Sequence, residues 1–291
     1  MTDYLNPRIP EGINTSESRP VLDFLLLTGG VLGVLVLALM FLGLGARWLA
    51  PLIPFSYEVG IAAPLVETVR KDESPGDERI RSYLQELADR LAAAQGLGPG
   101  MPIAVHYVDD DTVNAMATLG GNLVVYRGLL ERLPNENALA MVMGHEIAHV
   151  RHRDPIVSLG QGVVVDVALA ALSGVASSDM TRQVMGEAGL LTTLSFSREQ
   201  ERDADSAALQ SLAAVYGHAA GGTDLYRVLL NPGEEGSGPG IDFFDTHPDT
   251  RRRILTMEAE AKAQGFVTDG PITPLPSWLR ESLAEAKAAR R

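Results

Sequence analysis

The feature that most constrains the fold is an uncharged run of residues near the N-terminus. Phe24–Leu44 contains no charged residue and is dominated by Leu, Val and Gly. At about 1.5 Å per residue, a helix of this length crosses a hydrocarbon core about 30 Å thick. Arg47 and Trp48 follow directly, and such residues anchor helix ends at the membrane interface. We therefore predict a transmembrane helix within residues 21–48, behind a flexible tail at residues 1–20.

Arginines near the two ends of this span indicate its orientation. Arg8 and Arg19 precede the span, and Arg47 alone follows it closely. Because positive residues favour the cytoplasmic side, we expect the N-terminus in the cytoplasm and the following domain beyond the membrane. This predicts a single-pass protein of a bacterial inner membrane, in contact with lipid and with its large domain in the periplasm. A signal peptide is the competing interpretation, but the polar tail is long and no clear small-residue cleavage site follows.

Charge and cysteine content exclude several classes of function. The chain has 291 residues and a formal net charge of -13, which argues against a general nucleic-acid binder because phosphates require clustered Lys and Arg. There is no cysteine, so disulfides and thiolate metal ligands are excluded. Any metal site must therefore use histidines and carboxylates. The sequence does not indicate an oligomeric state.

The motif His145-Glu146-Ile147-Ala148-His149 ends the apolar run Ala138–Gly144. On an α-helix, residues four apart share one face, so His145 and His149 would direct two imidazoles at one point, as a zinc ion requires. Glu146 would lie beside them and polarise a water molecule. Asn135 is a suitable N-cap for this helix, and we expect positive charge to close its far end. An ordinary solvated histidine pair is the alternative, but a charge on an apolar helix needs a partner or a metal.

A catalytic zinc site takes three protein ligands and leaves one position for water. A histidine six residues after His149 would complete one known arrangement, but Pro155 occupies that position. The best candidates for the third ligand are Glu201 and Asp205, which share a helix face in the segment SREQERDAD. One carboxylate can bind the metal while the other accepts a hydrogen bond from a ligand histidine. The alternative is a solvated helix face laced with ion pairs.

HEIAH followed about fifty residues later by SREQERDAD resembles the family of membrane-associated zinc metallopeptidases that includes HtpX, the Ste-type CAAX prenyl protease and BepA. The resemblance covers roughly residues 58–260. It implies one zinc ion per chain, held by His145, His149 and Glu201. It also implies Glu146 as the catalytic base and Asp205 as the hydrogen-bond partner of a ligand histidine.

The segment Asp245–Arg253 extends this resemblance. His247 lies in a Thr-His-Pro sequence that resembles one whose histidine reaches the zinc in BepA-like relatives. It follows Asn231–Gly240, which is rich in Gly, Pro and Glu and is typical of a mobile loop. We expect His247 to act as a lid, or to assist the transition state once displaced; a helix-capping histidine is the alternative. Arg253 is expected to pair with a carboxylate near the site, as a gate or transition-state group.

Other segments predict supporting structure. Asp77–Gln95 has helical spacing of its apolar residues, Ile103–Val108 is typical of a strand, and Asn114–Tyr126 of a pair of strands. We expect a further helix from Met180 through Phe196 to His218. Three features are expected to lie outside the metal site, and these are His106 as a packed strand residue, His152 as a solvated helix end and Asp109–Asp111 as a turn.

A second apolar stretch, Ile156–Ala176, is interrupted by Gln161 and Asp166. A charge near a bilayer centre costs at least about 2.5 kcal/mol. We therefore expect a buried or membrane-facing helical hairpin here and keep a second membrane span as the alternative.

Together these features predict a mainly α fold with a small β-sheet, an α+β protein with a zincin-type, gluzincin-like domain at residues 58–268. A linker and short helix follow at residues 269–291. By resemblance, the function is that of a membrane-anchored zinc endopeptidase that cuts misfolded or unfolded membrane or envelope proteins. The alternative is a non-catalytic membrane scaffold or chaperone-like module that zinc merely stabilises.

Overall fold

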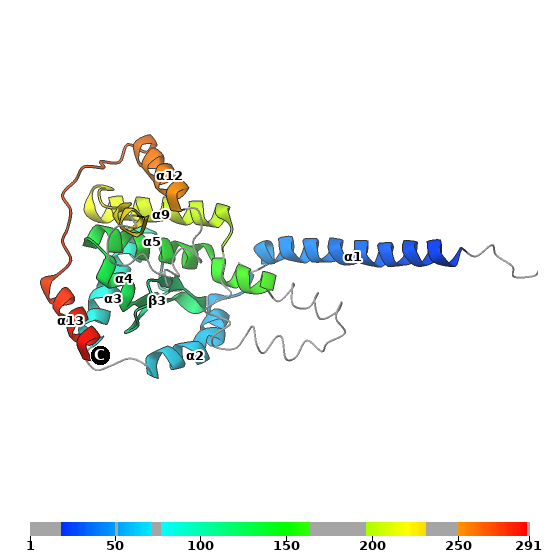
Figure 1. Ribbon diagram of the computed structural model, residues 1–291, viewed down its shortest axis with the longest axis horizontal. Helices are drawn as coiled ribbons and strands as arrows, with labels where there is room; N and C mark the ends of the chain where they lie inside the picture. Colours follow the sequence, from blue (N-terminus) through cyan, green and yellow to red (C-terminus); the bar gives the residue numbers. More distant parts are fainter. Residues whose placement is uncertain (1–18, 50–51, 72–76, 163–195, 231–249, 290–291) are drawn as a thin grey trace, which may run out of the picture.

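The computed structural model describes residues 19–49, 52–71, 77–162, 196–230 and 250–289. Within these ranges the chain is mainly helical and contains a single three-stranded sheet. The predicted α+β class is therefore confirmed. One long helix projects from the packed remainder of the chain, and the C-terminus lies on the opposite side (Figure 1).

Helix α1 (Pro20–Leu49) contains the predicted membrane span. Among the described residues it is the one helix long and apolar enough to cross a membrane, and no part of its Pro20–Ala38 window is buried. Trp48, at the far end, is 82% exposed. A helix whose apolar side chains have no protein to pack against needs another apolar solvent, and a bilayer supplies one.

Helices α2 (Phe55–Lys71) and α3 (Glu78–Ala94) follow the span. The structure confirms the predicted amphipathic helix in α3, which buries a stripe at three- and four-residue spacing made of Ile80, Leu84, Leu87 and Leu91. This stripe packs into the core beneath the sheet and helix α5. Burial of each such side chain stabilises the fold by roughly 1.5 to 3 kcal/mol.

The sheet has the strand order β1-β3-β2. Strand β1 (Ala104–Val108) runs parallel to β3 (Asn122–Tyr126), and β2 (Ala115–Ala117) runs antiparallel to β3. The predicted strand and strand pair are thus confirmed. A 3₁₀ turn, η3 (Leu119–Gly121), joins β2 to β3. Its Gly120 has φ +72°, and a Cβ atom there would lie 2.8 Å from the backbone of Val59 in α2, so glycine allows both the turn and the close approach of that helix. Strand β2 is left as an edge strand.

After the short helix α4 (Arg127–Arg132), helix α5 (Glu136–His152) forms the centre of the domain. Asn135 caps it as predicted, because its side-chain oxygen accepts the N–H of Ala138 at 2.8 Å. Arg153, with φ +64°, ends it in the left-handed conformation. Every residue from position 136 to 150 is buried. Helix α5 therefore holds its polar motif inside protein rather than at the surface.

Helix α9 (Arg198–Tyr216) begins later than predicted. Phe196 and Ser197 are not helical, so the expected continuous helix through Phe196 is wrong at this point, and residues 180–195 lie outside the described residues. Ser197 and Gln200 form a reciprocal capping box, which satisfies backbone donors at the first turn and fixes the helix start. Gly217, with φ +79°, ends the helix one residue short of the expected His218.

The apolar stretch after α5 is only partly described. Residues 154–162 are helical, and Ile156 and Val157 are buried against Ala62 and Val69 of α2. The start of the expected hairpin therefore faces protein. Asp166 and the rest of the stretch lie outside the described residues.

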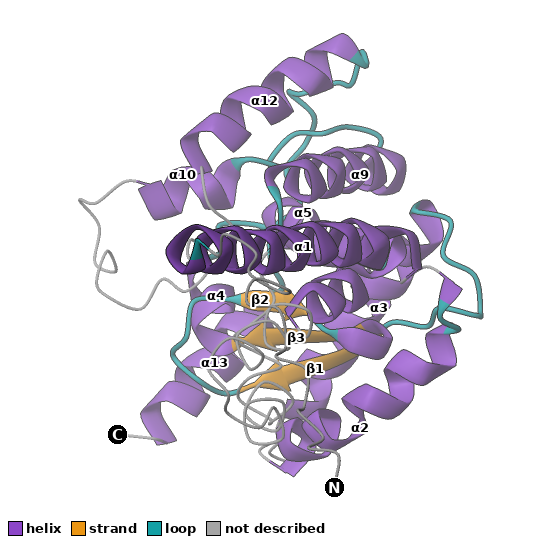
Figure 2. Ribbon diagram, turned by 90° about the vertical axis from the view of Figure 1, so that its right-hand side faces the viewer, coloured by secondary structure: helices purple, strands orange, loops and turns teal. Residues whose placement is uncertain are grey.

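In the described part of the chain after α9 there are three further helices, and these are α10 (Asp224–Leu230), α12 (Thr250–Ala263) and α13 (Ser277–Ala289). Helix α13 confirms the predicted C-terminal helix, and it buries Leu279 and Leu283 in the main core. Helix α12 lies against α9 on the outer side of the domain (Figures 1 and 2). Two helices, α5 and α9, thus lie between the sheet and α12.

Candidate metal centre

Helices α5 and α9 bring together two imidazoles and one carboxylate. His145 and His149 come from α5 and Glu201 from α9, and all three residues are buried. The Nε2 atoms of the histidines are 3.0 Å apart. Glu201 places its two carboxylate oxygens 3.4 Å from His145 Nε2 and 3.6 Å from His149 Nε2. The ligand atoms lie within 4.8 Å of one another, so this group could hold a metal ion.

Close packing of α5 on α9 sets this convergence. Gly144 precedes the motif, and a Cβ atom there would lie 2.9 Å from Ser211 Oγ and 3.4 Å from Ala208 Cα in α9. Glycine therefore lets the two backbones approach next to the histidines. Gln95 follows α3 and donates a hydrogen bond from Nε2 to the carbonyl oxygen of Gly144 at 2.7 Å. This hydrogen bond ties α5 to the end of α3, so a second contact besides α9 holds α5 in position.

Carboxylates orient both histidines. Asp205 Oδ1 is 3.0 Å from His145 Nδ1, and Asp154 Oδ2 is 2.8 Å from His149 Nδ1. Each carboxylate accepts a hydrogen bond from the Nδ1–H, which leaves Nε2 as the ring atom directed at the common point, as metal-ligating histidines require. The structure thus brings Asp205 to the place that the resemblance implied.

Asp154 is a site residue that the sequence analysis missed. It follows the left-handed Arg153 immediately and so turns back toward His149. Gln200 of α9 holds its other oxygen through a hydrogen bond of 2.7 Å. An Asp just past the end of a His-bearing helix was the available signal, but recognising it needs the turn geometry at Arg153.

The two histidines differ in protonation because their surroundings differ. Burial and the Arg253 charge lower the pKa of His145, but hydrogen bonds with Asp205 and Glu201 outweigh them and raise it to about 9. Burial lowers the pKa of His149, and the hydrogen bond with Asp154 does not offset this. The pKa of Asp205 lies below its usual range, since interactions with His145 and Arg253 outweigh burial.

Glu146 lies between the ligand pair and the edge of the sheet. It is fully buried, and its Oε2 accepts the backbone N–H of Ala117 in β2 at 2.7 Å. The neighbouring positions Asn114 and Thr118 bond to β3 instead, so Ala117 faces the outer edge of the sheet. A buried carboxylate beside the potential metal group is therefore fixed against a strand edge.

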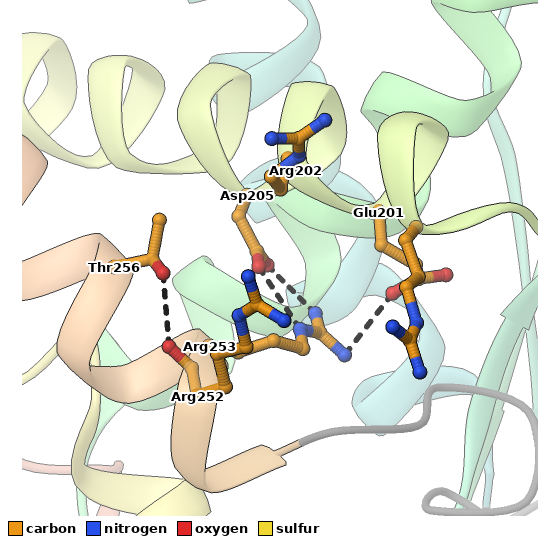
Figure 3. A pocket seen from close by; sticks show the side chains of 7 residues that line it. Glu201, Arg202, Asp205, Arg252, Arg253 and Thr256 are labelled. Carbon is orange, nitrogen blue, oxygen red and sulfur yellow. Dashed lines mark hydrogen bonds and ion pairs between the residues drawn. The ribbon is translucent and has the colours of Figure 1, made fainter.

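Arg253 of α12 reaches into this site, as expected for a residue tied to a carboxylate. Its Nε and Nη2 bind the two oxygens of Asp205 at 2.9 and 2.6 Å, and its Nη1 lies 3.1 Å from Glu201 Oε2 (Figure 3). The guanidinium also stacks 5.2 Å from the ring centroid of Tyr226. Arg253 thus balances the charges of two buried carboxylates at once. Without such a partner, burying these charges in a protein interior would be costly.

Phe196 is a further contact that the sequence analysis missed. Its ring stacks on His149 with centroids 3.9 Å apart and planes at 23°. It directly precedes the N-cap of α9, so the cap that fixes the helix start also places this ring. The stack limits rotation of the His149 ring and covers one of its faces.

The remaining candidates lie elsewhere or outside the described residues. His106 is buried in β1 with its Nε2 3.0 Å from Asn122 Oδ1, and Asp109 and Asp111 pair with Arg127. Of the described parts of the chain, only His145, His149 and Glu201 form a potential metal group. His247 and the preceding Asn231–Gly240 loop lie outside the described residues.

The donor set fits a catalytic zinc ion. Two imidazoles and one carboxylate are a known catalytic ligand combination that leaves a fourth position for water. Both imidazoles have their second nitrogen fixed by a carboxylate, and no thiolate competes because the chain lacks cysteine. The buried charges therefore match a divalent cation at this point.

Comparisons with known proteins agree with this geometry. The profile of the family described as Peptidase family M48 matches residues 77–261. Mitochondrial metalloendopeptidase OMA1 of Schizosaccharomyces pombe is 31% identical over 178 residues, which cover 60% of this chain and 51% of that protein. Beta-barrel assembly-enhancing protease of Escherichia coli is 29% identical over 256 residues, covering 74% and 50%. Protease HtpX of Legionella pneumophila is 25% identical, covering 80% and 91%. The chain thus spans about half the length of the first two relatives.

Proposed function

Because the chain belongs to peptidase family M48, we propose that it is a membrane-anchored, zinc-dependent endopeptidase. The observation that carries this proposal is the placement of Glu146. It lies next to two carboxylate-oriented histidines and a buried third ligand, and it is bound to the edge of the sheet. A structural metal site does not need a carboxylate in that position.

His145, His149 and Glu201 would hold the zinc ion. When bound, it supplies Lewis-acid chemistry and brings the pKa of a water molecule towards neutrality. Glu146 accepts the proton of the attacking water and passes it to the leaving amine. The Ala117 N–H keeps Glu146 Oε2 in place during both transfers.

Strand β2 is suited to hold the substrate. Its inner edge pairs with β3, while on the outer edge the N–H of the buried Ala117 binds Glu146 and the other main-chain groups of the strand are left for a substrate. An extended peptide can add to such an edge through main-chain hydrogen bonds. The ligand residues are at most 3% exposed, so a folded protein surface cannot reach them. This supports unfolded or misfolded chains as substrates, with membrane and envelope proteins as the natural source.

Helix α1 supports the proposed location. We place it across a bacterial inner membrane with the catalytic domain in the periplasm, following the arginine distribution at its ends. A reporter that is active only in the periplasm, fused after the last residue, should therefore be active. Activity confined to the cytoplasm would contradict this orientation.

The substitution Glu146→Gln tests the proposed chemistry. It removes the proton acceptor and keeps the side-chain size, so casein cleavage should fall by about 100- to 10,000-fold. Bound zinc, measured by mass spectrometry, and the circular dichroism spectrum should be retained. Glu199→Gln, an exposed carboxylate on α9, serves as the matched control. If the unmodified protein binds zinc and cleaves no unfolded protein, the scaffold interpretation replaces this one.

A further inference from the structure

A pocket of about 300 Å³ lies on the outer side of the metal centre, between α9 and α12. The metal-site residues Glu201 and Asp205 form part of its lining (Figure 3). Its volume is at the lower end of the range for small-molecule pockets, about 300 to 1,000 Å³. It therefore suits a side chain or a chain end rather than a folded partner.

The pocket is basic, although the chain is acidic. Four of its lining residues are arginines, and these are Arg198, Arg202, Arg252 and Arg253. The two carboxylates in the lining, Glu201 and Asp205, are both bound to Arg253. Among the lining residues themselves, four arginines outnumber two carboxylates, so the lining is positive in a chain with net charge -13.

Arg202 and Arg252 face this pocket from two different helices. Arg202 lies one turn after Arg198 on α9, and Arg252 lies on α12. Neither Arg202 nor Arg252 forms an ion pair with any residue that the structure describes, and both side chains are exposed. An exposed guanidinium group without a counter-ion can bind a carboxylate through paired hydrogen bonds.

We propose that this pocket is a subsite for a carboxylate of the polypeptide substrate, bound by Arg202 and Arg252. The proposal rests on the proposed peptidase function and names a substrate preference for it. Because Glu201 belongs to both the pocket and the metal group, the bound carboxylate lies a few residues from the scissile bond. The carboxylate belongs to an Asp or Glu side chain or to the C-terminus of the substrate.

The preference can be measured with quenched fluorescent peptides that differ only near the cleavage site. Each peptide carries Glu, its neutral counterpart Gln, or Lys at one position, and each is made with a free and an amidated C-terminus. For the zinc-loaded, full-length protein we expect kcat/KM to be about tenfold higher for the best Glu peptide than for its Gln partner. A Glu-to-Gln ratio near one, together with faster cleavage of the free-acid peptides than of the amidated ones, instead assigns the pocket to chain ends.

The variants Arg202→Gln and Arg252→Gln remove the two charges and keep polar side chains of similar shape. Each should lower the Glu-to-Gln ratio, and the double variant should bring it close to one. The ratio is independent of any overall loss of activity. The matched control is Arg132→Gln on α4, which is outside the pocket and should keep the ratio of the unmodified protein. The same peptides are titrated against the Glu146→Gln protein, where binding is read by fluorescence anisotropy without cleavage.

The outcomes separate the two proposals. If the unmodified protein cleaves no peptide and no casein, the peptidase function fails. If it cleaves peptides at low salt with a Glu-to-Gln ratio near one and with no effect of C-terminal amidation, the peptidase stands and the carboxylate subsite is wrong. A ratio that persists in the double variant also overturns the subsite. Since exposed charges are screened by salt, a genuine preference should weaken as ionic strength rises.

Discussion

The two sides of the metal centre are held in different ways. On the α5 side, His149 is fixed by Asp154, five residues away, and Glu146 by the neighbouring strand. On the α9 side, Glu201 and Asp205 depend on Arg253, which lies on α12 about fifty residues later. His149 therefore has a partner close in sequence, whereas the two carboxylates of α9 require a separate helix to dock.

Helix α12 docks through a narrow stripe. Among its described side chains the buried ones are Arg253, Met257 and Ala261, spaced four apart, whereas Leu255 on the same helix is 68% exposed. The first residue of the stripe is the one that binds the site carboxylates. Arg253 therefore contributes both to the charge balance of the metal centre and to the attachment of α12. Substitutions can distinguish these two contributions.

The largest effect is expected from Glu201→Gln. It removes the proposed anionic ligand and leaves Arg253 with Asp205 alone, so zinc affinity should fall by more than the roughly 10- to 100-fold typical of outer hydrogen-bond partners. Peptidase activity should be lost with the metal. Zinc binding is measured by competition with a chelating dye. Asp203→Asn, on the exposed face of α9, should bind zinc normally, and equal losses in the two variants would contradict the ligand assignment.

The next effect concerns the docking of α12. Arg253→Met removes the cation and leaves Asp205 buried, which should lower the free energy of unfolding by about 3 to 5 kcal/mol in chelator-treated protein. With zinc bound the loss should be smaller, because the metal offsets the charge of Glu201. Urea unfolding with and without zinc measures both values.

Arg252→Met is the matched control for this comparison. Arg252 is the preceding residue but is exposed, so its replacement should change stability by no more than about 0.5 kcal/mol. If Arg253→Met proved as mild as the control, α12 would be held by its apolar residues alone. The two sides of the site would then not differ as described.

Smaller effects should follow from the two supporting carboxylates. Asp205→Asn and Asp154→Asn each weaken the hydrogen bond that orients a ligand histidine, so zinc affinity should fall by about 10- to 100-fold. Asp205→Asn should be the stronger, because Asp205 also binds Arg253. Dye competition on the purified variants ranks them. The reverse order would show that the local side is the more sensitive one.

The sequence was sufficient for the side of the site that is local in sequence. Two histidines four apart on an apolar helix with Asn135 as its cap predict α5. The helical spacing of apolar residues predicts α3. Glu201 and Asp205 were reached because catalytic zinc needs a third ligand. Residue spacing at helical periodicity carries this information directly.

Other features depend on geometry that spacing does not encode. Asp154 reaches His149 only because Arg153 adopts a left-handed conformation. Phe196 stacks on His149 only because Ser197 starts α9, where we had expected an unbroken helix. The charge balance at Arg253 involves residues about fifty positions apart, and docking of α12 cannot be read from local pattern.

The smallest predicted effect is a difference between the two histidines in proton release. In chelator-treated protein, the pKa of His145 is raised from 6.5 to about 9, so its stabilising contribution is complete below about pH 6.5 and is lost as pH rises through about 9. His149 has a lowered pKa and is already neutral at pH 7.5. Zinc binding at that pH should therefore release about one proton, from His145.

Calorimetric titration of zinc in buffers with different ionisation enthalpies measures this release at pH 7.5. Asp205→Asn removes a hydrogen bond that raises the pKa of His145, so fewer protons should be released. Asp154→Asn should leave the number unchanged, because His149 carries no proton to lose. Equal release from both variants would mean that the histidines titrate alike. In that case the charge on the α9 side would not depend on the network around Arg253, and the contrast between the two sides would be limited to their packing.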